Sequence, residues 1–359
     1  MIFRNARSKK LNQFVCDLIV QYFLNSTYHE IIPESMRAII PVAGVGSRLR
    51  PHTYTVPKVL LNVAGKPIIG HILDKIIEAG FDEATIIVGY LGEMIKEYVQ
   101  SQYSIKVDFV EQEERLGLGH AIYISRHTFS QQPILIILGD TIFDVDLKSM
   151  IENQQTQIGV KHVDDPRRFS VAETSNGWIT HLLEKPDVPK SNLAIVGLYY
   201  IVHPQILVDC LKDMIQNNTR TKGEFQLTDA LQMMIDRGEQ MKTFPVEGWF
   251  DCGKPETLLS TNKYLLERQP PLAPRKDVLI RPPAFISPSA TVSNSIVGPH
   301  ATIADRAMVE NTIVRNSIIS EGATVVNSLI EDSIIGSNAI LRGSYKRINI
   351  GDSSELEFY

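Results

Sequence analysis

The C-terminal part of the chain repeats itself with a short period. Asn294, Asn311 and Asn327 each precede a Ser or Thr and then two apolar residues, so the motif recurs after 17 and then 16 residues. Such a period is typical of a parallel β-helix, in which every coil has three flat sides that point apolar residues inward, and the coils must stack because one coil cannot bury its interior alone. The predicted inward residues are Val297, Ile303, Val309, Val314, Ile319, Val325, Ile330 and Ile335.

Residues 36–267 follow a different pattern, in which short apolar runs alternate with segments of helical period. This alternation predicts one α/β domain with a doubly wound, mostly parallel, Rossmann-like sheet that helices cover on both faces. Strands are predicted at 37–42, 84–89, 106–111, 133–140, 170–174, 179–184 and 194–201, and helices at 68–80, 92–100, 119–129, 204–216 and 226–238.

The remaining boundaries follow from composition. Five prolines mark residues 268–283 as a linker, so the β-helix is predicted at 284–350 and a tail at 351–359. Residues 1–35 are expected to form an extension with an amphipathic helix. A signal peptide is not expected there, because polar residues interrupt the apolar segment and no small-residue cleavage site follows.

Charge and cysteine content exclude several classes of protein. A net charge of -5 argues against general nucleic-acid binding, which needs a strongly basic face. No run approaches the roughly 18 apolar residues of a membrane span, so no membrane partner is expected. Cys16, Cys210 and Cys252 are odd in number and far apart, which gives no disulfide framework. A reducing, cytoplasmic location is therefore expected.

The stretch "PVAGVGSRLRPHTYTVPK", residues 41–58, follows the first predicted strand. Small residues at Ala43, Gly44 and Gly46 would let backbone N–H groups approach an anion, and Arg48 and Lys58 add positive charge. Because ligands bind at the carboxyl ends of strands in open α/β sheets, this stretch is a candidate triphosphate cradle. The alternative is a plain turn with solvated basic residues.

Four further residues lie at predicted strand ends. Asp140 ends the most apolar strand, where a carboxylate is costly unless it faces a cleft or a cation. Asp251 follows another strand, and Mg²⁺ typically takes one or two protein carboxylates. Each aspartate could instead cap a turn. Glu184 and Lys185 end a strand before a proline, and alone they indicate only an exposed strand end.

Six motifs occur in order over residues 37–267: "AGVGSRLRP" leading to "PK", "LGLGHA", "LGD", "EKP", "KGEFQLTDAL" and "GWFDCGKPETLL". Because it carries these six motifs in this order, the chain resembles the sugar-1-phosphate nucleotidylyltransferases. It is most similar to the long form of the glucose-1-phosphate thymidylyltransferases, which carry a C-terminal left-handed β-helix. The resemblance implies nucleotide-sugar and polysaccharide biosynthesis by a homo-oligomer.

The implied reaction joins an NTP, dTTP by this resemblance, to glucose 1-phosphate and releases pyrophosphate with the help of Mg²⁺. Its nucleophile is a phosphate oxygen that is already ionised, so no general base is needed. The resemblance assigns catalysis to Arg48 and Lys58, nucleotide binding to Ala43, Gly44, Gly46, Gln112 and Gly117, sugar-phosphate binding to Glu184, Lys185, Gly197 and Glu224, and magnesium binding to Asp140 and Asp251.

Three positions depart from the thymidylyltransferase pattern. Val59 stands where Gln is usual, Thr141 where Asn is usual, and Ser170 where Gly is usual. The glycine-rich motifs also resemble those of uridylyltransferases, and thymine and uracil differ by one methyl group, worth about 1–3 kcal/mol of discrimination. A UTP–glucose-1-phosphate uridylyltransferase and a mannose-1-phosphate guanylyltransferase therefore remain alternatives.

Two alternatives from other classes have specific sequence requirements. An acyltransferase working through the β-helix would need a catalytic His between coils, and this segment holds only His300. A non-catalytic regulatory paralogue usually loses the phosphate-binding Arg, the Lys or a metal-binding Asp, all of which this chain retains. The β-helix is therefore expected to serve oligomer contact or regulation.

Overall fold

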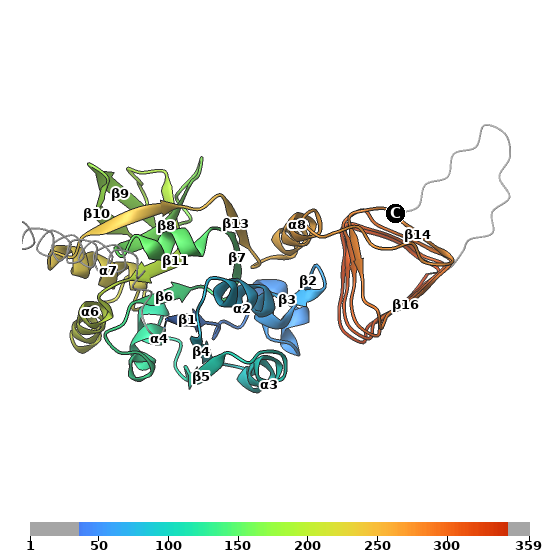
Figure 1. The fold of residues 1–359 in the computed structure, drawn as a ribbon, viewed down its shortest axis with the longest axis horizontal. Helices are drawn as coiled ribbons and strands as arrows, with labels where there is room; N and C mark the ends of the chain where they lie inside the picture. The colour runs from blue at the N-terminus through green and yellow to red at the C-terminus, as the bar shows by residue number, and fades with distance from the viewer. Residues whose placement is uncertain (1–35, 344–359) are drawn as a thin grey trace, which may run out of the picture. The chain divides into compact units, whose positions relative to one another are not determined.

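The computed structural model describes residues 36–343, so the predictions for residues 1–35 and 344–359 lie outside its description. An α/β part runs from strand β1 to helix α8, and short stacked strands follow from β14 to β25 (Figure 1). Within the described range, no helix is both long and apolar enough to cross a membrane.

The central sheet confirms the predicted α/β domain. Its strand order is β10-β9-β11-β6-β1-β4-β5, with β8 beside β11 and β12 beside β8. β1 lies parallel to β4 and β6, whereas β11 runs antiparallel to β6, β8 and β9. The strands are β1 (Arg37–Pro41), β4 (Glu83–Val88), β5 (Lys106–Glu111), β6 (Ile134–Ile137), β8 (Thr156–His162), β9 (Val171–Ser175), β10 (Trp178–Leu183), β11 (Leu193–Ile201) and β12 (Met241–Pro245).

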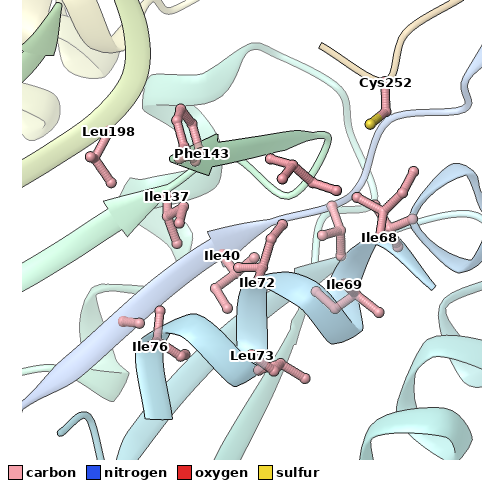
Figure 2. Packing of buried hydrophobic residues seen from close by; sticks show 14 of the residues in the cluster. Ile40, Ile68, Ile69, Ile72, Leu73, Ile76, Ile137, Phe143, Leu198 and Cys252 are labelled. Atoms are coloured by element: carbon pink, nitrogen blue, oxygen red, sulfur yellow. The ribbon is translucent and has the colours of Figure 1, made fainter. Parts of the chain in front are cut away.

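Helices cover both faces of this sheet, because its strands are apolar on both sides. Ala38 and Ile40 of β1 pack in a first hydrophobic cluster with α2, whereas Ile39 packs in a second cluster on the opposite face. Figure 2 shows Ile72 and Ile76 of α2 beside Ile40. The first face carries α2 (Ile68–Glu78) and α3 (Gly92–Gln102), and the second carries α4 (Leu118–Ile124), α6 (Pro204–Gln216) and α7 (Leu227–Asp236).

Further elements complete the α/β part. The sequence pattern predicts two of them, since β13 is the strand expected before Asp251 and η4 lies inside the helix expected at 119–129, and it does not predict the others. β7 and β13 pair antiparallel in a separate two-stranded sheet, and β2 and β3 form a hairpin. These elements are β2 (Asn62–Val63), β3 (Lys66–Pro67), β7 (Thr141–Asp144), β13 (Gly248–Asp251), α5 (Leu147–Glu152), α8 (Pro255–Leu266) and the 3-10 turns η1 (Ser47–Leu49), η2 (His52–Tyr54), η3 (Lys58–Leu60) and η4 (Arg126–Thr128).

The C-terminal strands confirm the predicted β-helix and its period. They form three parallel four-stranded sheets, the walls of the prism in Figure 1. The sheets contain β14 (Val278–Ile280), β17 (Ser295–Val297), β20 (Ile313–Arg315) and β23 (Leu329–Glu331); β15 (Ala284–Ile286), β18 (Ala301–Ile303), β21 (Ile318–Ile319) and β24 (Ile334–Ile335); and β16 (Thr291–Ser293), β19 (Met308–Glu310), β22 (Thr324–Val326) and β25 (Ile340–Arg342).

The registers of these sheets explain the repeat. Val297 pairs with Val314, and Val314 pairs with Ile330 one coil further on. Seven of the eight predicted inward residues are buried in one cluster, and Ile335 packs against it half-buried. The repeated asparagines adopt positive φ angles of 45, 50 and 55°, a conformation that Asn tolerates better than most residues. The first coil begins at β14, inside the range predicted as linker.

Adjacent isoleucines in α2 test how much the first hydrophobic cluster stabilises the domain. Ile76 is fully buried, whereas Ile77 is 41% exposed. We expect Ile76→Ala to lower the free energy of unfolding by about 2–5 kcal/mol because it leaves a cavity. Ile77→Ala should change it by less than about 0.5 kcal/mol. Urea unfolding followed by circular dichroism measures both, and equal losses would contradict this packing.

Candidate active site

A cavity of about 540 Å³ lies at the carboxyl end of β6 and beside β11 and the β7–β13 pair. Five of the predicted site residues line it: Asp140, Glu184, Lys185, Gly197 and Asp251. The remaining predicted residues lie outside the lining of this cavity. The structure therefore brings the predicted metal-binding and sugar-phosphate-binding residues to one place, apart from Glu224.

The β7–β13 pairing brings the two predicted metal ligands together. Asp251 ends β13 directly opposite Thr141, which follows Asp140. The backbone N–H of Cys252 donates a hydrogen bond to the carbonyl of Asp140 at 3.0 Å. The Asp140 side chain remains 43% exposed. Two carboxylates from distant parts of the chain thus face one cavity.

Two cations from the segment after β1 join these carboxylates. Lys58 Nζ donates to Asp140 Oδ2 at 2.8 Å, and the Lys58 side chain is only 8% exposed. A Cβ atom at Gly253 would lie 2.9 Å from Arg48 Nη2 and 2.7 Å from Asp251 Oδ1, so the guanidinium and the carboxylate flank the same glycine. Lys58 and Arg48 therefore lie beside the two aspartates, although neither cation lines the cavity itself.

The turn between β1 and η1 leaves its backbone accessible. Gly44 is exposed, and nothing lies within 4 Å of the position where its side chain would project. Gly46 adopts φ 62°, and its carbonyl accepts a hydrogen bond from Thr53 Oγ1 at 2.8 Å. Ala43 is buried beneath the turn. A phosphate group can therefore approach the backbone at Gly44 without displacing a side chain.

Two hydroxyl groups and one lysine hold the Glu184 carboxylate. Its side chain is 6% exposed and accepts hydrogen bonds from Ser170 and from Thr228, the latter at 2.9 Å, while Lys185 Nζ lies 3.1 Å from Oε1. Burial alone would raise the pKa of the Glu184 carboxyl group, but these donors and the Lys185 charge outweigh it. The pKa therefore lies below its ordinary value of 4.5, and Glu184 is ionised at neutral pH.

The predicted base-reading residues form a separate contact. Gln112 is 7% exposed, and its Nε2 donates to the carbonyl of Gly117 at 3.2 Å. Gly117 has φ 111°, and a side chain there would collide with the carbonyl of Phe225. Gly197 has φ 87°, and a side chain there would likewise collide with the Leu138 side chain. Both positions require glycine because of their backbone angle and their neighbours.

Glu224 occupies a different position from the other predicted sugar-phosphate residues. It is exposed, and its carboxylate accepts a hydrogen bond from Gln226 Nε2 at 3.3 Å. Gln226, and not Glu224, lines the cavity. Lys222 of the same motif donates from Nζ to the carbonyl of Lys185 at 2.7 Å. This hydrogen bond ties the motif to the end of β10.

Sequence reasoning missed several residues that shape the cavity. Thr228 shares the Glu184 carboxylate with Ser170, and nothing in the sequence indicated that contact. Phe169 and Trp249 meet edge to face with ring centroids 4.8 Å apart, and both line the cavity. Thr141, noted only as a departure from the thymidylyltransferase pattern, also lines it and donates to Asp140 Oδ1 at 3.2 Å.

Comparison with known proteins identifies the family. The family model described as nucleotidyl transferase matches residues 37–268, which is more than half of the chain. The chain belongs to the sugar-1-phosphate nucleotidyltransferase family. Its activity is therefore the transfer of a nucleotidyl group to a sugar 1-phosphate.

Relatives of this nucleotidyltransferase differ in the nucleotide that their names specify. It is 31% identical over 314 residues to a glucose-1-phosphate thymidylyltransferase of Streptomyces griseus, covering 79% of this chain and 87% of the relative. It is 32% identical over 231 residues to the UTP–glucose-1-phosphate uridylyltransferase AglF of Haloferax volcanii, covering 62% and 93%. The structure of a UDP-glucose pyrophosphorylase complexed with UDP-glucose shares the fold, with a TM-score of 0.58, 24% identity, and coverage of 66% and 100%.

The donors around Glu184 generate a prediction about the pH dependence of stability. A carboxyl group whose folded pKa is depressed stabilises the fold above its unfolded pKa and loses that contribution as pH falls through the folded pKa. Ser170→Ala removes one donor. The free energy of unfolding should therefore be higher for wild type than for Ser170→Ala at pH 7. This difference should shrink as the pH falls below about 4.5.

Urea unfolding between pH 7 and pH 4 measures this difference. Ser175→Ala is the matched control, because Ser175 lies exposed at the end of β9. A wild-type advantage over Ser170→Ala that stays constant across this range would contradict the role assigned to the Ser170 hydroxyl group.

Proposed function

We propose that this nucleotidyltransferase uses dTTP and glucose 1-phosphate and forms dTDP-glucose and pyrophosphate with Mg²⁺. The proposal rests on the observation that Asp140, Asp251, Glu184 and Lys185 all line one cavity. The thymidylyltransferase of Streptomyces griseus supports the choice of nucleotide, since its match covers 79% of the chain against 62% for the uridylyltransferase.

The charges of the site suit the chemistry of the transfer. An oxygen of the sugar phosphate attacks the α-phosphorus of the NTP, a new P–O bond forms, and the bond to the β-phosphate oxygen breaks to release pyrophosphate. Arg48 and Lys58 would hold phosphate oxygens and stabilise the negative charge that builds on them. No proton has to be removed from the nucleophile, so the site needs no general base.

The pair of aspartates fits one divalent cation. Among residues 36–343, no group of three or more His, Cys, Asp and Glu side chains is placed to hold a metal ion, so protein ligands alone would not fill its shell. Mg²⁺ is commonly bound by one or two carboxylates together with water and substrate phosphates. Each Asp140 oxygen accepts one hydrogen bond, which leaves each oxygen a free lone pair. Bound there, the ion would neutralise phosphate charge during transfer.

Glu184 and Lys185 would bind the sugar phosphate. The ionised Glu184 carboxylate can accept hydrogen bonds from sugar hydroxyl groups, and the exposed Lys185 can neutralise the phosphate. Gly197 lines the same cavity, and its backbone would contact the sugar hydroxyl groups. Gln112 and the backbone at Gly117 would contact the base.

UTP is the second candidate nucleotide. The AglF relative is 32% identical to this chain over the nucleotidyltransferase domain. Uracil offers the same polar edge as thymine, so Gln112 could bind either base. The missing methyl group changes affinity by only about 1–3 kcal/mol.

A nucleotide panel tests the proposed reaction. Purified enzyme is mixed with glucose 1-phosphate and either dTTP, UTP or GTP, with and without Mg²⁺, and pyrophosphate release is measured. We expect the highest kcat/KM with dTTP and no release after chelation of Mg²⁺. A preference for UTP or GTP would overturn the choice of nucleotide. No release with any pair would favour the regulatory paralogue.

The two basic residues generate a prediction about turnover. Arg48→Ala and Lys58→Ala should each lower kcat by roughly 10²–10³-fold, the effect of losing one preorganised donor to a developing charge. Arg50→Ala is the matched control, because Arg50 lies in the same segment and stacks over the Tyr54 ring instead. Steady-state kinetics measure all three variants. Turnover near that of the wild type in both test variants would refute these roles.

A further inference from the structure

One outward-facing row of the β-helix is buried. In the sheet β15-β18-β21-β24, the side chains of Ile303 and Ile319 point into the coils, so their neighbours Thr302 and Ile318 point outward. Outward side chains of a β-helix normally face water, yet Thr302 is 0% and Ile318 1% exposed. The outer row, defined as Phe285, Thr302, Ile318 and Ile334, is therefore covered by another part of the chain.

The α/β domain provides that cover. Ile318 belongs to the first hydrophobic cluster, together with Leu49, Val59 and Leu61 and not with the interior of the coils, and Ile334 packs against that cluster. The Phe285 ring lies against Gly65, where a Cβ atom would come within 2.5 Å of it. Close packing of this kind resists displacement of either partner.

A second contact lies near the fourth coil. A Cβ atom at Gly336 would be 3.3 Å from Nδ1 of His52. His52 belongs to η2, between Arg48 and Lys58. The β-helix therefore touches the chain on both sides of Lys58, at His52 and at Gly65.

Asn262 of α8 joins the two parts through buried hydrogen bonds. Its Oδ1 accepts from Thr302 Oγ1 at 2.6 Å and from the backbone N–H of Ala64 at 2.8 Å, and its Nδ2 donates to the carbonyl of His300 at 3.1 Å. Asn262 and Thr302 are both 0% exposed. Because a buried polar group left without a partner is costly, this arrangement has little freedom to shift.

These contacts converge on the segment 46–65, which carries Arg48 and Lys58. Gln269 Nε2 donates to the carbonyl of Ala64 at 2.7 Å, so side chains hold both backbone groups of Ala64. From Ala64 the chain leads back through β2 to Lys58, whose carbonyl accepts from the N–H of Leu61 at 3.1 Å. A displacement of Ala64 would therefore be passed on to Lys58.

We propose that the β-helix positions the segment 46–65, and that Thr302 and Asn262 are its positioning residues. The proposal rests on the proposed function in one respect, the assignment of NTP phosphates to Arg48 and Lys58. Small errors in the position of such groups weaken catalysis strongly. Thr302 acts through Asn262 and Ala64 and does not touch the substrates.

Thr302→Val tests the proposal, because valine keeps the shape of threonine and removes the hydroxyl donor. Thr324→Val is the matched control, since Thr324 lies in β22, in another sheet of the β-helix. Thr302→Ser restores the hydroxyl group and should rescue the defect. Should Thr302→Val fail to fold, Ile334→Ala, which trims the half-buried end of the outer row, takes its place.

The first readout is amide hydrogen exchange in peptides that cover residues 46–65. Thr302→Val should speed exchange there, with the other strands of the central sheet unchanged, and Thr324→Val should not. Equal exchange in the two variants would overturn the proposal. This readout needs no substrate, so it decides the inference even if the nucleotide panel refutes the proposed function.

The second readout separates the two substrates. We expect Thr302→Val to raise KM for the NTP about tenfold, the scale of one buried hydrogen bond left unmade, and to change KM for the sugar phosphate by less than about twofold. Parallel rises in both constants, or no rise in either, would contradict a role at the NTP phosphates.

Discussion

The antiparallel pairing of β7 and β13 is the contact on which the site depends. It sets Asp251 opposite Thr141 and so places Asp251 beside Asp140. Gly139 brings the end of β6 against β1, because a side chain there would collide with Val42. The basic segment that follows β1 consequently lies next to the acidic pair. Two short strands from distant parts of the chain thereby bring together the opposite charges to which we assign phosphate and magnesium binding.

The sequence predicts the long, regular parts of this molecule, because their patterns are set by local periodicity and burial. α6 was predicted with its observed bounds, and the inward row of the β-helix followed from the 16- and 17-residue repeat. The same repeat indicated Asn294, Asn311 and Asn327, which turn the corners with positive φ. The ordered motifs also indicated most of the residues that meet at the cavity, since "LGD" follows β6, "EKP" follows β10 and "GWFDCGKPETLL" contains the end of β13.

The tertiary contacts could not be predicted in this way. β7 and β13 have four residues each, too few to show a period, and their pairing joins distant segments. Asn262 occupies an ordinary position in a helix, and only the folded chain shows that it serves both Ala64 and Thr302. The sequence places Glu224 in a motif with Gln226 but does not give the direction of either side chain. Strand pairing, buried hydrogen bonds and side-chain direction of this kind depend on contacts between segments that are far apart in the sequence.

In the proposed mechanism, fixed charges of the site stabilise the phosphates during transfer. Buried Lys58 donates a hydrogen bond to Asp140, and the Arg48 guanidinium and the Asp251 carboxylate flank Gly253. Anomalous diffraction from crystals grown with Mn²⁺ and a non-hydrolysable NTP analogue tests this account most directly. We predict one manganese peak bonded to carboxylate oxygens of both Asp140 and Asp251 and to phosphate oxygens of the nucleotide. A peak bonded to neither aspartate, with the nucleotide bound, would contradict it.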